Sequence, residues 1–134
     1  MKSISLYILF LSIPLISRSQ EGGFPIIRNY TTSEYNNEPQ VFAAIQDKSG
    51  ILYFSAADGI MEYDGVRWRN ISTGKDLRIY DFAINRDNNI YVAANGDFGY
   101  LFSDDRGNPM YQSLLYLLPD TFTLGTVWSL RSTS

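Results

Sequence analysis

The sequence has neither cysteine nor histidine among its 134 residues. Without cysteine no disulfide can form, so burial alone must stabilise the fold. Without histidine the chain lacks the commonest general base and the commonest metal ligand. Zinc sites and nucleophile systems of the Ser-His or Cys-His kind are therefore excluded, and we expect no catalytic residue, no metal and no cofactor.

An excess of positive charge is also missing, because 11 basic residues face 14 acidic ones and the net charge is −3. A chain with this balance has no electrostatic footprint for nucleic acid or for an anionic membrane surface. We therefore expect neither of them as a partner.

The first residues, 1–19, predict a secretory signal peptide. Lys2 gives a positive start, an apolar stretch runs from Ile4 to Ile16, and Ser17 to Ser19 form a small-x-small cleavage site. A membrane anchor is the alternative, but the stretch is shorter than the roughly 20 apolar residues of a spanning helix. We expect export, with no membrane span after cleavage.

Aromatic residues are abundant, at 15% of the chain with ten Tyr and eight Phe. They alternate with Val, Ile and Thr between Gly, Asn and Asp, which is the composition of strands and turns. After the leader no stretch keeps a helical apolar pattern; the nearest, Ser113 to Leu118, ends at Pro119. We predict an all-β fold.

A repeat organises this all-β chain. Residues 41–56 align without a gap on residues 79–94, about 38 positions further on, and Val127 to Leu130 begin a third copy. Repeats of this size made of short strands are typical of propeller blades or of solenoid units.

Within the first repeat we predict four antiparallel strands, at residues 41–45, 51–56, 60–63 and 66–71. The Asp-Gly pair between the last two is the strongest hairpin signal in the chain. Asp satisfies local backbone groups in turns and Gly supplies positive φ. The expected turn residues, with one from the second repeat, are Asp47, Gly50, Gly59, Asp64, Gly65 and Gly107.

The distribution of polar residues favours radial packing of these strands. The strand at 51–56 is largely apolar on both faces, which indicates that both are covered. The last strand instead places Arg67 and Arg69 opposite Val66 and Trp68, as expected of an outer strand with one wet face. A flat sandwich would show wet faces throughout. We predict a partial β-propeller of about two four-stranded blades and the start of a third.

The predicted organisation follows from this repeat. It comprises a signal peptide (1–19), an initial strand or closing segment (20–40), a first blade (41–74), a second blade (75–120) and the start of a third (121–134). Propellers typically use 4 to 8 blades. We therefore expect the chain to be the front end of a longer protein or a truncated gene product, with unpaired edges and one uncovered blade face.

The chain resembles the opening of the two-component regulator propellers, periplasmic sensors of Bacteroidetes-type bacteria that are often found with a triple-tyrosine module. The matching features are the initial segment 23–30, the turn 46–53, the hairpin 59–68 and the segment 125–130. Two features depart from the family: Tyr53 stands where Trp is frequent, and 102–108 replace the Tyr-Asp-Gly hairpin.

The resemblance implies a receptor whose exported propeller senses an extracellular cue, commonly an oligosaccharide. A Tyr-rich β-sandwich, a transmembrane helix and a histidine kinase or DNA-binding domain would follow the propeller, and the parent protein would be anchored in the inner membrane. Any kinase activity would belong to those parts. Two other functions stay open: a secreted glycan-binding or glycan-active propeller, and a non-functional truncated product.

Candidate ligand contacts are Tyr35, Tyr63, Arg67, Trp68, Arg78 and Tyr100. Aromatic rings stack on sugars and Arg supplies polar contacts, but the alternative is packing, in which large aromatic residues bury much area. Glycoside cleavage uses a pair of carboxylates, and four acidic residues are candidates for such a pair, although Asp also occupies nearly every turn of this chain. They are Asp58, Asp64, Asp97 and Asp120. Residues 103–108 resemble a calcium loop but lack its twelfth-position acid, so we predict a plain hairpin turn.

Overall fold

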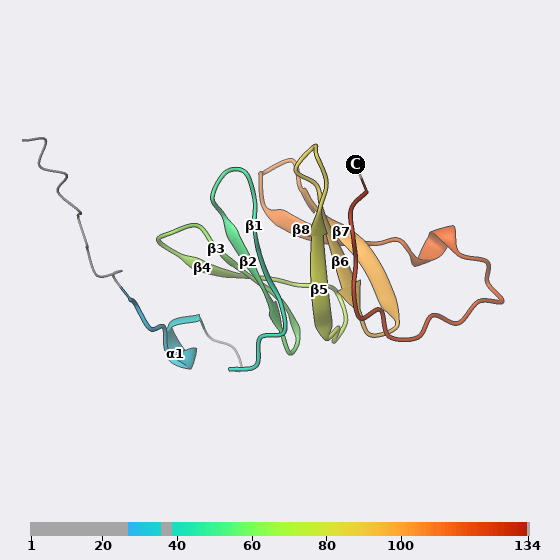
Figure 1. Ribbon diagram of the computed structural model, residues 1–134, viewed down its shortest axis with the longest axis horizontal. Coiled ribbons are helices and arrows are strands. Elements are labelled where there is room, and N and C mark those ends of the chain that lie inside the picture. Colours follow the sequence, from blue (N-terminus) through green and yellow to red (C-terminus); the bar gives the residue numbers. More distant parts are fainter. Residues whose placement is uncertain (1–26, 36–38, 134) are drawn as a thin grey trace, which may run out of the picture.

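The computed structural model describes residues 27–35 and 39–133, and the predicted signal peptide lies outside them. Two four-stranded antiparallel sheets, each with its strands adjacent in chain order, make up the fold (Figure 1). The first contains β1 (Ala44–Gln46), β2 (Leu52–Ala56), β3 (Gly59–Tyr63) and β4 (Trp68–Ile71). The second contains β5 (Ile79–Ile84), β6 (Ile90–Ala94), β7 (Asp97–Ser103) and β8 (Pro109–Ser113). The predicted all-β class is confirmed.

Two short helical segments flank the sheets. The helix α1 (Thr32–Tyr35) precedes the first sheet, and the 3-10 turn η1 (Leu115–Leu117) follows the second. The turn η1 lies within Ser113 to Leu118, the stretch whose sequence comes nearest to a helical apolar pattern. Across the described residues, no helix combines the length and apolar character needed to cross a membrane.

Three turns share one hydrogen-bond pattern. The side chain that opens each turn accepts hydrogen bonds from the backbone N–H groups two and four residues later, at 2.8–3.0 Å. The accepting residues are Asp47, Asn85 and Asp104. The fourth position of each turn has positive φ, at Gly50, Asn88 and Gly107. Asp47 and Gly50 thus lie in the first of these turns, and the third turn falls within residues 103–108.

The hairpin between β3 and β4 differs from the prediction in one respect. The Asp64 carboxylate accepts hydrogen bonds from the N–H groups of Val66 (2.9 Å) and Arg67 (2.7 Å), and Gly65 has φ of 94°. These N–H groups are thereby turned away from the sheet, so β4 begins only at Trp68. The prediction of Val66 on the apolar face of a strand is wrong, since 81% of its surface is exposed.

The first strand also begins later than predicted, at Ala44 rather than at residue 41. The buried hydroxyl of Ser55 accepts hydrogen bonds from the N–H groups of Phe42 (2.6 Å) and Ala43 (2.9 Å). These two groups therefore find a side-chain acceptor instead of a ladder partner. The contact still holds the start of the repeat against β2.

The two sheets pack face to face around one apolar core. In β6, which the repeat aligns with β2, four of five residues are buried. Both faces of this strand are thus covered, as the sequence predicts. The core consists of Tyr53, Ile60 and Ile71 from the first sheet, Ile79, Phe82, Ile90, Val92 and Ala94 from the second, and Leu77 between them. Gly59 belongs to this close packing, because a Cβ there would lie 2.9 Å from the carbonyl oxygen of Ile71.

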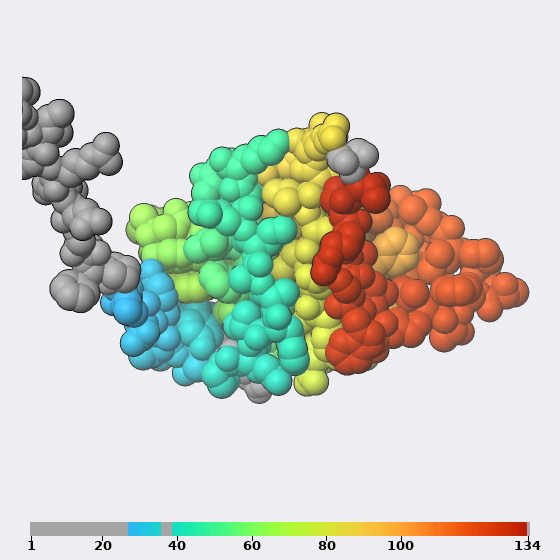
Figure 2. All heavy atoms as spheres, in the orientation of Figure 1, coloured from blue at the N-terminus to red at the C-terminus, as the bar shows by residue number. Residues whose placement is uncertain are grey.

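The end of the chain returns along the second sheet. Thr126 pairs with Asn95, and the N–H of Val127 donates to the carbonyl oxygen of Ala94 at 3.0 Å. Figure 2 shows the last residues (dark red) lying along the segment that contains β5 (yellow). The predicted third opening therefore contacts the face of the second sheet.

Candidate ligand-binding site

Trp68 lies at the centre of an aromatic cluster on the face of the first sheet that points away from the second. Its ring centroid is 4.6 Å from that of Tyr63, its cross-strand neighbour, and 5.5 Å from that of Phe54 on β2. Two rings from the initial segment complete the cluster, Tyr30 at 5.3 Å and Tyr35 at 5.6 Å. Aromatic pairs at these distances are favourable beyond the area they bury. The cluster therefore fixes the initial segment on the sheet.

A mainly apolar groove of about 590 Å³ adjoins the cluster, lined by both the initial segment and the first sheet. Its polar groups form a chain at one side: the Tyr30 hydroxyl donates to the Tyr63 hydroxyl, which donates to the carbonyl oxygen of Gly65, each at 2.7 Å. Arg28 lies 4.6 Å above the Tyr30 ring. The buried Nε1 of Trp68 has no hydrogen-bond partner among the described residues. An apolar groove with a few placed polar groups is the usual form of a ligand site.

Three of the six predicted ligand contacts, Tyr35, Tyr63 and Trp68, thus come together, and three do not. The backbone of Arg67 belongs to the hairpin turn. Arg78 is exposed beside β5. The ring of Tyr100 lies on the second sheet, 6.5 Å from that of Tyr91.

The prediction missed the contributions of Arg28, Tyr30 and Phe54 to this site. A signal for Phe54 was present in the alternation of β2, which places it on the face opposite Tyr53. The initial segment carries no comparable signal, because its position depends on contacts with residues more than thirty positions away.

Two buried carboxylates lie in the sheets rather than in an open cleft. Glu62 forms an ion pair with Arg69, and burial together with Glu62 raises the pKa of Tyr53 to about 12. Asp97 accepts a hydrogen bond from the Ser113 hydroxyl at 2.7 Å. The ammonium of Lys75 lies 2.9 Å from its other oxygen, as an ion pair without hydrogen-bond alignment.

Through these contacts Asp97 connects β7 to β8 and to the segment between β4 and β5 that contains Lys75. Burial and the neighbouring Asp97 raise the pKa of Tyr111. Asp64, a second acidic residue considered for glycoside cleavage, is engaged in its own turn. Within residues 27–35 and 39–133, no three acidic side chains gather as a metal site would require.

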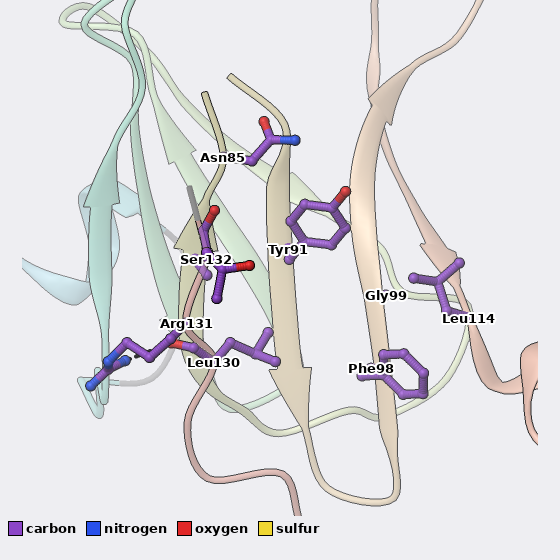
Figure 3. A pocket seen from close by; sticks show the side chains of 10 residues that line it. Asn85, Tyr91, Phe98, Gly99, Leu114, Leu130, Arg131 and Ser132 are labelled. Carbon is purple, nitrogen blue, oxygen red and sulfur yellow. Dashed lines mark hydrogen bonds between the residues drawn. The ribbon is translucent and has the colours of Figure 1, made fainter. Parts of the chain in front are cut away.

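A second apolar groove, of about 410 Å³, lies between the second sheet and the last residues of the chain. Figure 3 shows Leu130 pointing toward the strand that carries Tyr91, whereas Arg131 points the other way. Phe98 and Leu114 line the far side. This groove continues the apolar face of the second sheet.

Comparison with known proteins gave no match to a family model, to a curated protein or to a solved structure. The functional argument therefore depends on the sequence and on the geometry described above.

Proposed function

We propose that the chain is the amino-terminal, ligand-sensing part of a β-propeller in an exported periplasmic receptor of the two-component regulator type. Each four-stranded sheet would be one blade, and residues 121–134 would begin the third. The receptor would regulate signalling or transcription in response to an extracellular oligosaccharide. The motifs that resemble this family and the signal peptide predicted for residues 1–19 support the proposal.

The observation that carries the proposal is the way the third opening meets the second sheet. In the first pair of sheets, β5 packs against β1 and β2. The segment after Thr126 takes the corresponding place beside β5, where the N–H of Leu130 and the hydroxyl of Ser129 both donate to Asp81 at 3.0 Å. The third opening thus lies against the second repeat on the side where the second repeat lies against the first, which supports the proposed radial assembly.

A sensing mechanism follows if a ligand occupies the groove beside Trp68. The initial segment and the first sheet both line this groove, so a bound ligand would contact two parts of the chain at once. A ligand shifts a receptor between two arrangements only by its difference in affinity for them. The groove would supply such a difference if the initial segment had a second position on the sheet in the other receptor arrangement.

Two measurements test the proposal. The DNA beyond the Ser134 codon is sequenced, and the exported product is analysed by amino-terminal sequencing. We expect further repeats of roughly 40 residues, one membrane span and a kinase or DNA-binding domain, with cleavage after Ser19. An immediate stop codon, or an uncleaved leader, would contradict the receptor assignment.

A further inference from the structure

One aromatic residue from each repeat contributes to a continuous row, which we call the aromatic row: Phe42, Tyr80 and Trp128. The ring centroids of Phe42 and Tyr80 are 5.4 Å apart, and those of Tyr80 and Trp128 are 4.5 Å apart. All three residues occupy the second position of their repeat in the alignment. The row therefore runs from one repeat to the next.

The aromatic row is accessible, unlike the cluster around Trp68. Phe42 exposes 43% of its surface and Trp128 exposes 68%. Contiguous exposed apolar residues mark interaction sites more often than single ones do. Among residues 39–133 there are other exposed aromatic side chains, such as that of Tyr116, but no ring contact links it to this row.

Each ring of the row is held by a separate backbone contact. The buried Ser55 hydroxyl accepts the N–H of Phe42. A register shift between Ile79 and Asp81 produces a bulge at Tyr80, and bulges redirect side chains. Trp128 lies between Val127 and Ser129, which bond to the second sheet. The rings are thus positioned before any ligand arrives, which lowers the entropic cost of binding.

The charges beside the row indicate the class of ligand. The Asp81 carboxylate, next to Tyr80, forms an ion pair with Arg131 at 3.1 Å. This pairing leaves the Asp81 carboxylate compensated, so it does not attract a quaternary ammonium, and the pair itself has no net positive charge that would attract a polyanion. The side chain of Arg131 is nonetheless 80% exposed, so its guanidinium can donate hydrogen bonds to hydroxyl groups.

We propose that the aromatic row binds a neutral oligosaccharide, whose apolar ring faces stack on Trp128 and Phe42 while Arg131 donates to its hydroxyl groups. The inference rests on the proposed sensing function and specifies its ligand class. It adds a second contact site for this ligand, on the aromatic row and separate from the groove beside Trp68.

The test is calorimetric titration of the full chain with neutral hexasaccharides: cellohexaose, xylohexaose, mannohexaose and maltohexaose. We expect saturable binding of at least one. Trp128→Ala should weaken it about tenfold or more, as loss of a central binding residue does. Trp128→Phe keeps a ring and should restore most of the affinity. The matched control is Tyr116→Ala, which removes an equally exposed ring outside the row and should change nothing.

Circular dichroism checks that each variant keeps its strands. If Trp128→Ala does not fold, Arg131→Ala replaces it, with an expected loss of affinity of about fivefold. Binding that neither variant weakens would overturn the inference, as would binding of a heparin hexasaccharide or tetramethylammonium in preference to the neutral sugars. Failure of every neutral hexasaccharide to bind would also overturn it. None of these results bears on the gene sequence or leader cleavage, which test the receptor assignment separately.

Discussion

Replacing Ser55 with Ala should loosen the start of the first repeat without unfolding the sheet. The Ser55 hydroxyl is fully buried and accepts the N–H groups of Phe42 and Ala43. The variant leaves two backbone donors without an acceptor, and a buried unsatisfied donor costs about 1–3 kcal/mol. Phe42 is partly exposed, so water can accept part of the hydrogen bonding that the hydroxyl provided. We therefore take the lower limit of this range as the cost for each of the two N–H groups.

The sum is about 2 kcal/mol, which corresponds to roughly 30-fold faster amide hydrogen exchange at Phe42 and Ala43. Exchange is the appropriate measurement because it reports each amide and does not require cooperative unfolding. The amide of Ser55 donates to the carbonyl oxygen of Ala43 and serves as an internal reference. Ser49→Ala, at an exposed serine in the next turn, is the control and should leave both amides unchanged.

Unchanged exchange at Phe42 and Ala43 in Ser55→Ala would refute the reasoning, and so would an equal acceleration across the whole first sheet. The second repeat has Ala93 at the aligned position and uses a different solution. There the strand bulges, and the Asp81 carboxylate accepts the N–H of Phe82 at 2.9 Å. The serine hydroxyl is therefore specific to the first repeat.

Two further substitutions test other polar contacts. Lys75→Met removes the cation beside the fully buried Asp97 and should cost about 2–3 kcal/mol, seen as a lower urea midpoint, while adding Asp97→Asn should restore most of it. Partial burial opposes ionisation of Asp81, but hydrogen bonds from Leu130 and Ser129 outweigh it and lower its pKa. Because the folded-state pKa is the lower one, this stabilisation holds above the unfolded value of about 3.9 and is lost as the pH falls below it. The fluorescence of Trp128 should change in that acidic range, and Asp81→Asn should abolish the transition; a change that persists in Asp81→Asn would contradict this account.

Local patterns in the sequence were sufficient to predict the all-β class and most of the strands. The turn at Asp47 and Gly50 depends on a side chain and a positive φ within five residues, both visible in the sequence. The observed strands begin later than predicted where a side-chain oxygen accepts the hydrogen bond of a backbone N–H that would otherwise pair with the neighbouring strand. Ser55 does so for Phe42, and Asp64 does so for Val66. Strand patterning alone does not reveal which side chains will act in this way.

The candidate site was less predictable because its parts meet over long distances in the sequence. Tyr63 and Trp68 follow from the hairpin register, but Tyr30 reaches Tyr63 from thirty-three positions away. The aromatic row is an intermediate case. The alignment of the repeats already placed an aromatic residue at each second position, and only the packing of the sheets brings those rings into contact.

The two tryptophans differ in their surroundings: Trp68 is packed among other rings, whereas Trp128 lies on the surface. Trp68 is surrounded by four rings and holds the initial segment on the first sheet, so its removal would affect stability before it affects any ligand. Trp128 contacts the Tyr80 ring and leaves most of its own surface open. An aromatic residue occupies this position in all three copies of the repeat. A further repeat of the same kind would therefore lengthen the aromatic row by one ring. The length of oligosaccharide that binds best should then increase with the number of repeats, which titration of a variant carrying an additional copy of the second repeat can measure.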